Sequence, residues 1–414
     1  MCAVRPLCVL TIAITLLSAP LARAQTVVAS DVAEDATDAN SQPKVGFTSR
    51  GEAYLTFVKP IRDVGQVFVA SSADLRRWDV QQITHATVPS RYPALAVGGD
   101  DAVHIAWTQY DQGVGRVYYA RTEGGRWSLP VKVSPGDAYA GVPALAVDRR
   151  GTVHLVWYGI RPEAPAVRTK HGSVYEILYT ASHDGQWLPP VLISPGVPDA
   201  VNPSLGIDDL GRIHSAWYQF DLRTYQARHA MYISAWTPPR TISSGHDDAF
   251  AVSLAAGKQG TVYVVWERRE AAGGRIYFAE FQKQWRPQQQ ISSPTENAFH
   301  PAVAVDDSGR IFVAWDAGGQ IMVRQRGSDW ESAERVPADG RNMQPTLGTS
   351  TGTVLLAWTQ ALAGTFRIQV ATLQGNRLAP APAQSQTPWS ALALLAVLLS
   401  AAFLWTRRRR SITS

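Results

Sequence analysis

The arginine, tyrosine, histidine and acidic residues best suited to bind or transform a ligand are concentrated between residues 161 and 268. The candidate binding set is Arg161, Glu163, Arg168, His171, Tyr175, Glu176, Asp221, Arg223, Tyr225, Arg228, Glu267 and Arg268. Arginine holds a carboxylate or phosphate through two parallel hydrogen bonds, and tyrosine rings stack on sugar rings. The alternative interpretation is a set of solvated loops whose charges neutralise one another. No residue is assigned a catalytic role.

A histidine recurs at one position of a repeated sequence, as His104, His154 and His214. Three histidines from different repeats are one way to build a metal site. Tyr263 and Phe312 occupy the same position in later repeats. Because aromatic residues substitute there, the pattern favours packing over metal binding.

Asp199, Asp248 and Asn297 each stand four residues before the position that opens the next repeat. Side chains that form turns explain this pattern, and cation ligands around a channel mouth are the alternative. The two cysteines, Cys2 and Cys8, lie in the first 24 residues, so we expect no disulfide or cysteine-bound metal in the rest of the chain. No Walker loop, dinucleotide fingerprint, nucleophile elbow or zinc-protease motif is present, and the sequence predicts no metal and no cofactor.

The net charge of +5 belongs to the two ends of the chain. Of the 39 basic residues, two lie in residues 1–24 and four in residues 407–410, and the others nearly balance the 34 acidic residues. A nucleic-acid surface needs an excess of lysine and arginine, so we expect no nucleic-acid partner.

The middle of the chain is one repeat that occurs seven times. Each copy opens at a proline or valine and ends at an aromatic residue, at positions 57, 107, 157, 217, 266, 315 and 358. A second tryptophan series interleaves with the first, at positions 78, 127, 187, 236, 285 and 330. Twelve of the 14 tryptophans belong to these two series. A sequence pattern that recurs about every 50 residues throughout the middle of the chain indicates a repeat architecture.

Each repeat contains four segments with the alternation, β-branched residues and glycine or aspartate turns that are typical of strands. Four strands in such a period predict an all-β fold, a seven-bladed β-propeller of four-stranded antiparallel blades over residues 25–378, with six blades as the alternative. The last repeat lacks a fourth-strand tryptophan, and residues 26–30 resemble the end of a fourth strand. We therefore expect the N-terminal strand to complete the last blade, which removes the free sheet edges of an open array.

The turns before the second tryptophan series resemble Asp-boxes, written S/T-x-D-x-G-x-x-W. The residues that carry this resemblance are Ser72, Asp74, Trp78, Thr122, Trp127, Ser182, Asp184 and Trp187. On these motifs the chain resembles the sialidase superfamily of Asp-box (BNR repeat) propellers, in which the box is structural and lies away from the active face. The resemblance places a site on the opposite face, on the loops that join strands 2–3 and 4–1.

Sialidases imply six blades, three arginines that hold a sialic-acid carboxylate, an aspartate acid/base and a tyrosine nucleophile paired with a glutamate. Their first arginine stands in an Arg-Ile-Pro motif, and here that position reads Ser41-Gln42-Pro43-Lys44. The missing arginine and the seventh repeat predict that the chain is sialidase-like without being a true sialidase.

Both ends of the chain resemble targeting segments. Residues 1–24 combine Arg5, an apolar run and an Ala-x-Ala site at Ala22–Ala24, which predicts a secretory signal peptide. Residues 379–388 read as a linker, residues 389–406 as a transmembrane helix between tryptophans, and residues 407–414 as a basic cytoplasmic tail. The same C-terminal pattern also resembles a sorting signal that is cut off.

These patterns predict a propeller on the outer side of a bacterial membrane, at the cell surface or in the periplasm. The interpretation favoured is a binding or scaffold module for a glycan, peptide or protein partner. The alternative is a sialidase-like glycoside hydrolase, which needs carboxyl groups, or a Tyr–Glu pair with an aspartate, to converge near the propeller axis.

Overall fold

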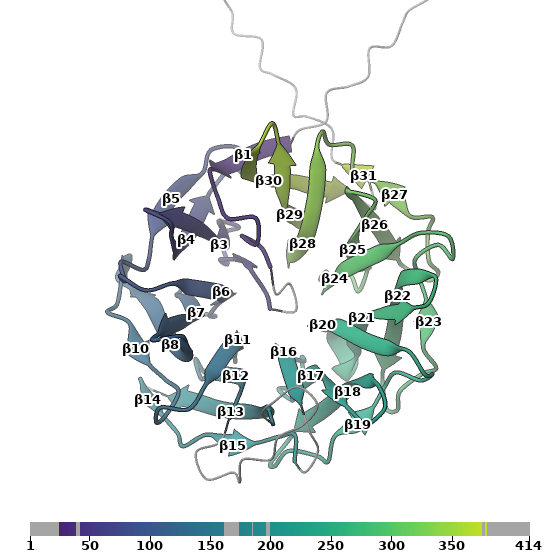
Figure 1. Ribbon diagram of the computed structural model, residues 1–414, viewed down its shortest axis with the longest axis horizontal. Coiled ribbons are helices and arrows are strands. Elements are labelled where there is room, and N and C mark those ends of the chain that lie inside the picture. The colour runs from purple at the N-terminus through teal and green to yellow at the C-terminus, as the bar shows by residue number, and fades with distance from the viewer. Residues whose placement is uncertain are drawn as a thin grey trace, which may run out of the picture. The chain divides into compact units, whose positions relative to one another are not determined.

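The computed structural model describes residues 25–38, 42–160, 174–183, 185–195, 199–374 and 377–378. In these residues the chain forms seven antiparallel sheets arranged as a ring around a central axis (Figure 1). The prediction of an all-β, seven-bladed propeller with four-stranded blades is therefore confirmed. A single 3-10 turn, Lys258–Gly260, is the one helical element in the described part of the chain.

The blades are numbered in chain order, and their strands run from the axis to the rim. Blade 1 contains β2 (Val45–Phe47), β3 (Ala53–Ile61), β4 (Val64–Ser72) and β5 (Asp79–Gln82). Blade 2 contains β6 (Ser90–Val97), β7 (Val103–Asp111), β8 (Val114–Glu123), β9 (Arg126–Trp127) and β10 (Val131–Lys132). Blade 3 contains β11 (Ala140–Val147), β12 (Val153–Gly159), β13 (Glu176–His183), β14 (Gln186–Trp187) and β15 (Val191–Leu192).

Blade 4 contains β16 (Ala200–Ile207), β17 (Ile213–Phe220), β18 (Tyr225–Tyr232) and β19 (Arg240–Thr241). Blade 5 contains β20 (Asp248–Ala256), β21 (Val262–Glu270), β22 (Gly273–Phe281) and β23 (Gln289–Gln290). Blade 6 contains β24 (Ala298–Val305), β25 (Ile311–Ala317), β26 (Gln320–Arg326) and β27 (Glu334–Arg335). Blade 7 contains β28 (Arg341–Ser350), β29 (Thr353–Leu362), β30 (Thr365–Gln374) and β31 (Arg377–Leu378), and its outer strand is β1 (Gln25–Ser30).

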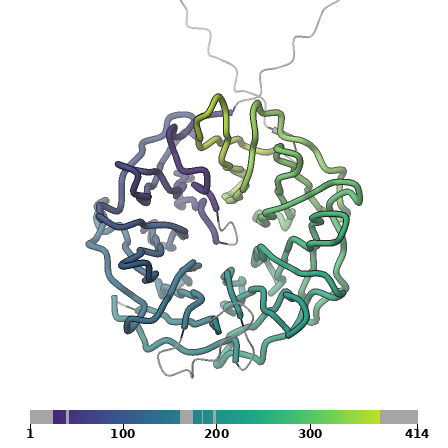
Figure 2. Tube along the Cα trace, viewed as in Figure 1, coloured from purple at the N-terminus to yellow at the C-terminus, as the bar shows by residue number. Residues whose placement is uncertain are grey.

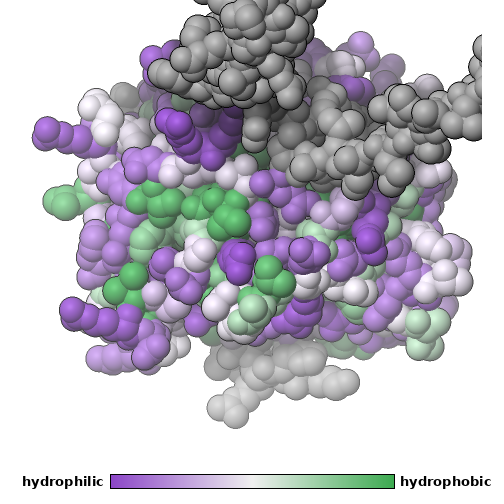
Figure 3. Space-filling view, turned by 90° about the horizontal axis from the view of Figure 1, so that it is seen from above, coloured by the Kyte–Doolittle hydropathy of each residue, from purple (hydrophilic) through white to green (hydrophobic). Residues whose placement is uncertain are grey.

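The N-terminal strand closes the ring. β1 pairs antiparallel with β30, from Gln25 opposite Ala371 to Ser30 opposite Arg367. This pairing confirms the expectation that residues 26–30 complete the last blade. After β1 the chain runs from the rim to the centre, as the purple tube in Figure 2 shows, and begins the inner strand of blade 1. The edge of the ring that carries β1 and β30 shows polar residues with apolar residues interspersed (Figure 3).

The repeated tryptophan of the second strand forms the core between blades. Trp107, Trp157, Trp217, Trp266, Trp315 and Trp358 have no exposed surface, and Phe57 takes this place in blade 1. The second tryptophan series covers the neighbouring blade, as where Trp187 meets the ring of Tyr119 edge-on at 5.1 Å. A single blade has little apolar core of its own. Burial of these large rings between blades therefore contributes strongly to the free energy of folding.

The turns that resemble Asp-boxes hold their own backbone. The Asp74 carboxylate accepts hydrogen bonds from the backbone N–H groups of Arg76 and Arg77, both at 2.8 Å, and from the Ser72 hydroxyl at 3.3 Å. Trp78 packs against the apolar cluster between blades 1 and 7. Asp184 lies outside the described residues, so the third box is seen only through Ser182 and Trp187.

The Thr122 hydroxyl of the second box accepts the N–H of Val103 at 2.8 Å, and Trp127 donates to Gln81 at 3.1 Å. The first contact lies within blade 2, and the second joins blade 2 to β5 of blade 1.

The targeting segments predicted at both ends, residues 1–24 and 379–414, lie outside the described residues. Among the residues that are described, no helix has the length and apolar character needed to span a membrane.

Candidate functional site

The inner strands of blades 2 to 7 each carry a bulge at the residue before the opening proline or valine. In six blades this residue has a left-handed backbone, with φ between 48° and 55°, although none of the six is glycine. The six residues are Tyr92, Val142, Asn202, Ala251, His300 and Gln344. A non-glycine residue in this conformation costs about 1–3 kcal/mol and persists only when its surroundings hold it there.

Side chains of the preceding blade hold three of these bulges. The residue after the core tryptophan accepts the bulge N–H in each case: Thr108 from Val142 at 2.8 Å, Glu267 from His300 at 3.4 Å and Asp316 from Gln344 at 2.9 Å. Two carboxylates are thereby placed at the mouth of the channel, and both are buried.

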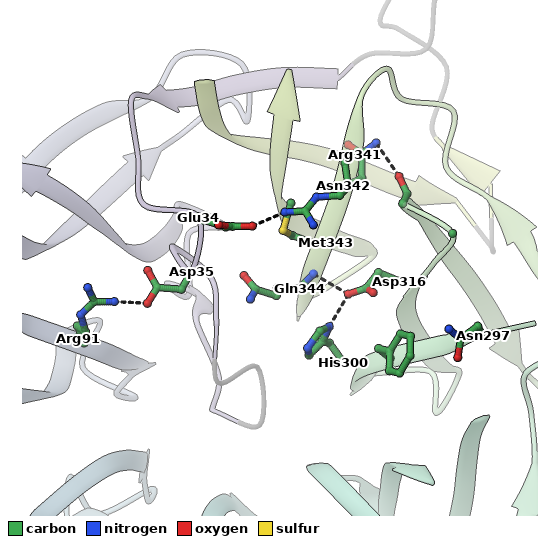
Figure 4. A pocket seen from close by; sticks show the side chains of 13 residues that line it. Glu34, Asp35, Arg91, Asn297, His300, Asp316, Arg341, Asn342, Met343 and Gln344 are labelled. Carbon is green, nitrogen blue, oxygen red and sulfur yellow. Dashed lines mark hydrogen bonds and ion pairs between the residues drawn. The ribbon is translucent and has the colours of Figure 1, made fainter. Parts of the chain in front are cut away.

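A cavity of about 810 Å³ lies at this mouth, between blades 6 and 7 and the segment that follows β1 (Figure 4). Its polar lining consists of Glu34, Asp35, Arg91, Asn297, His300, Asp316, Arg341, Asn342 and Gln344. The β25–β26 turn and the connection before β24 contribute to it, so it lies on the face formed by the strand 2–3 and 4–1 loops. Phe299 and Met343 add apolar surface. We call this site the mouth cavity.

His300 is the one titratable side chain in the mouth cavity that two buried carboxylates approach. Its Nδ1 lies 2.7 Å from Asp316 Oδ2, while Glu267 lies beside its backbone. Burial opposes the charged imidazolium, but the hydrogen bond and charge of Asp316, together with Glu267 and Asp38, raise the pKa of His300 above its usual value. Nε2 has no hydrogen bond to any described residue. The pair thus has the form of a base and the acid that orients it.

Two ion pairs close the other side of the mouth cavity. Arg91 pairs with Asp35, and Arg341 pairs with Glu34 (Figure 4). Both acids belong to residues 31–38, which bridge blades 7 and 1 through bonds such as Val32 N–H to the Phe366 carbonyl at 3.2 Å. The chain therefore supplies internal carboxylates to both arginines of the cavity.

Aromatic side chains continue the same face around blades 3 to 5. Tyr139, Tyr158 and Tyr175 form one group, with ring centroids 5.3–5.6 Å apart. A second group contains Tyr218, Phe220, Tyr225 and Phe250, with centroids 5.2–5.5 Å apart. All seven residues are half-buried. We call these two groups the aromatic arc.

The structure describes eight of the twelve residues in the predicted binding set, since Arg161, Glu163, Arg168 and His171 lie outside the described residues. Tyr175 and Tyr225 belong to the aromatic arc, and Glu267 borders His300. Glu176 is buried at the start of β13.

The other four lie apart from the mouth cavity. Asp221 accepts the N–H groups of Arg223 and Thr224 in its own turn, both at 2.9 Å, and Arg223 is exposed. Arg228 is half-buried on β18, and burial lowers the pKa of its guanidinium. Arg268 donates to Gln288 at 3.1 Å and to the Ser244 carbonyl, and it lies over the ring of Tyr277.

The repeated histidines do not converge. His104 bonds Tyr119 at 2.7 Å and His154 bonds Tyr179 at 2.8 Å, each within its own blade, and His214 bonds His229 at 3.1 Å. Within the described ranges, no group of three or more potential metal ligands is found.

The three Asp and Asn residues between repeats fasten one loop to another. Asp199, Asp248 and Asn297 accept the N–H groups of Tyr175, Tyr225 and Gly274 at 3.4, 2.8 and 2.7 Å. Each therefore ties a strand 4–1 connection to the start of the third strand of the preceding blade.

Sequence reasoning missed His300, Asp316, Arg91 and Arg341. The available signal was positional: His300 precedes the opening proline and Asp316 follows the core tryptophan. Both positions are polar or aromatic in several repeats, which is unusual for residues next to a core.

No protein-family model and no curated protein matches this sequence. Solved structures do match. An ulvan lyase of polysaccharide lyase family PL25 has a TM-score of 0.58 and 10% identity, covering 85% of this chain and 96% of the lyase. Polysaccharide lyase Uly1 has a TM-score of 0.53 and 9% identity, covering 80% of this chain and 90% of the lyase. A variant of NanB sialidase from Streptococcus pneumoniae has a TM-score of 0.49 and 10% identity, covering 85% of this chain and 71% of the sialidase.

The blade topology and the likeness to the lyases, whose TM-scores exceed 0.5, confirm the expected β-propeller fold. At identities of 10% or less, these likenesses show the fold alone.

Proposed function

We propose that this protein is a glycan-binding propeller that holds its ligand at the mouth of the channel. The observation that carries the proposal is the union, on one face, of the mouth cavity of about 810 Å³ with the aromatic arc. Half-buried rings provide flat apolar surfaces for sugar rings, and the cavity provides charged and amide groups for their substituents.

The comparison with known folds supports the choice of ligand class. A second structure of the PL25 ulvan lyase is described as bound to a glucuronate–rhamnose sulfate oligosaccharide, and it resembles this chain with a TM-score of 0.57. A propeller of this shape therefore holds an oligosaccharide in that protein. The mouth cavity and the aromatic arc are the reason to propose a glycan ligand for the present chain as well.

A panel of immobilised glycans, probed with the purified full-length protein, tests the proposal. Tyr225→Ala removes a ring of the aromatic arc, and Tyr232→Ala removes a half-buried ring at the other end of the same strand. We expect the first variant to lose retention at least fivefold and the second to keep it. A folded protein that no glycan retains contradicts the proposal, as does equal loss in both variants.

A second candidate function is a sialidase-like glycoside hydrolase or a lyase, and the His300–Asp316 pair favours it. Two buried carboxylates contact His300 at the mouth of the channel, Asp316 through the ring and Glu267 through the backbone N–H, and glycoside cleavage uses a pair of carboxyl groups. Release of product from aryl sialosides and uronate-containing polysaccharides tests this candidate. Turnover that is lost in His300→Asn, with glycan retention kept, identifies an enzyme; no turnover on any substrate leaves the binding function.

We also propose that the propeller is exported and tethered outside the membrane. The support is the sequence pattern of residues 1–24 and 389–414. Fractionation of cells that make the full chain, compared with a chain ended at residue 388, tests this. Full-length protein in the soluble fraction contradicts it.

A further inference from the structure

Blade 4 contains a series of buried, hydrogen-bonded polar side chains. Their hydrogen bonds determine which ring nitrogens carry a proton. Asp208 Oδ2 accepts from Arg212 Nε at 2.6 Å and lies 3.0 Å from His214 Nε2. Its Oδ1 accepts the backbone N–H groups of Leu210 and Arg212 at 3.0 and 2.9 Å. Burial alone would raise the pKa of Asp208, but these hydrogen bonds hold it below its usual value. An ionised carboxylate only accepts, so His214 carries its proton on Nε2.

The next side chain in this hydrogen-bonded series is His229. His214 has no exposed surface, and burial lowers its pKa, so the ring is neutral and its Nδ1 is a lone pair. His229 Nε2 lies 3.1 Å from this Nδ1 and must donate to it. Burial also holds the pKa of His229 well below its usual value. Its own Nδ1 is therefore an acceptor without a proton.

That acceptor is unpaired, in a side chain that is 4% exposed. Nδ1 of His229 has no hydrogen-bond partner among the described residues, and it is not one of their enclosed unpaired atoms.

His229 lines a second cavity, of about 350 Å³, between the outer parts of blades 4 and 5. The apolar residues around it are Met231, Pro238, Pro239, Phe281 and Trp285. Arg240 and Lys283 also line it, and both are exposed. The cavity borders the segments before β19 and β23, on the face of the strand 3–4 turns, whereas the mouth cavity lies on the opposite face.

Other blades show that packing does not require a histidine here. The equivalent strand residues are Tyr119, Tyr179 and Phe278, and a tryptophan of the next blade meets each edge-on at 5.0–5.1 Å. Trp285 meets His229 in the same way at 5.0 Å. An aromatic ring of any of these types packs against the tryptophan at this position, so packing does not require the unpaired Nδ1 of His229.

We propose that this cavity is a second binding site, for a small planar aromatic ligand with a hydroxyl donor at one end and a carboxylate at the other. The hydroxyl donates to His229 Nδ1, the ring lies among Trp285, Phe281 and the two prolines, and the carboxylate meets Arg240 and Lys283. A sugar fits less well, because its several hydroxyls need partners and the polar side chains that line the cavity are few, namely His229, Thr237, Arg240 and Lys283.

Titration of the full-length protein with 4-hydroxybenzoate and with 4-methoxybenzoate, by calorimetry, tests the proposal. The methoxy compound keeps the ring and carboxylate but cannot donate to His229. We expect saturable binding of the hydroxy compound and about tenfold weaker binding of the methoxy compound, the value of one hydrogen bond. Equal affinities, or no saturable binding of either compound, overturn the proposal.

Variants localise the effect. His229→Phe should weaken 4-hydroxybenzoate about tenfold and leave the methoxy compound unchanged, and we expect it to fold because Phe278 fills the same slot in blade 5. His229→Tyr, which copies Tyr119 and Tyr179, is the second replacement. Tyr179→Phe is the matched control in blade 3 and should not change either affinity. An unchanged affinity in both His229 variants contradicts the assignment.

Discussion

Three of the bulge residues around the channel donate to a side-chain acceptor in the neighbouring blade. Asp316 serves two neighbours at once, since its Oδ2 accepts the Gln344 N–H and also meets the His300 ring. A side chain that first stabilises a left-handed backbone can thus also orient a functional group. The structural and chemical roles of such a carboxylate are not alternatives.

His300 gives the fold a pH-dependent contribution to stability. Because its folded pKa is raised, protonation favours folding, so this contribution is fully present below about pH 6.5 and is lost as the pH rises through the raised pKa. His300→Asn removes it, and asparagine tolerates the left-handed backbone. We expect the difference in unfolding free energy between wild type and variant to shrink from about pH 5 to pH 9 in urea titrations. A constant difference contradicts this.

Lys44 shows the opposite dependence. Its ammonium is fully buried, bonds the Pro93 carbonyl at 2.8 Å, and has a pKa lowered by burial to about 7. Between this pKa and the ordinary value of 10.5, the unfolded state binds the extra proton, so stability rises with pH. Relative to Lys44→Met, the wild type should gain up to about 1.4 kcal/mol per pH unit in this interval. A difference in unfolding free energy between the two proteins that does not change with pH contradicts the lowered pKa of Lys44.

At the scale of single elements, β1 has a core face and a solvent face. Val28 is buried in the cluster between blades 7 and 1, whereas Val27 is 44% exposed. Val28→Ala should lower the free energy of unfolding by about 2 kcal/mol, and Val27→Ala by less than about 0.5 kcal/mol. Urea unfolding of the two variants measures both. Similar losses would mean that β1 does not pack as described.

The repeats made the elements predictable, because the tryptophan registers and turn residues are local features of the sequence. The same reasoning found the closing strand, since residues 26–30 resemble a fourth strand that the last repeat lacks. The mouth cavity was not predictable in this way. His300 and Arg91 belong to different blades, and their approach depends on the bulges and on how residues 31–38 cross between blades.

At the scale of the whole molecule, closure depends on one strand of six residues. Deletion of residues 25–30 exposes the edge of β30, which can then pair with the same edge or with β1 of another molecule. We expect the deleted protein to form dimers and larger species in light scattering after size exclusion. A synthetic peptide with the sequence of residues 25–30 should restore the monomer. A deleted protein that stays monomeric without the peptide would show that β1 is dispensable for closure.

The pairing of β1 with β30 also sets an order in time. The ribosome makes residues 25–30 before the rest of the propeller, and their partner, Thr365–Gln374, follows more than 330 residues later. At ordinary rates of synthesis this separation corresponds to roughly 20–70 seconds. The first strand of the propeller is therefore the last to find its place, and six blades can be complete while the ring is still open.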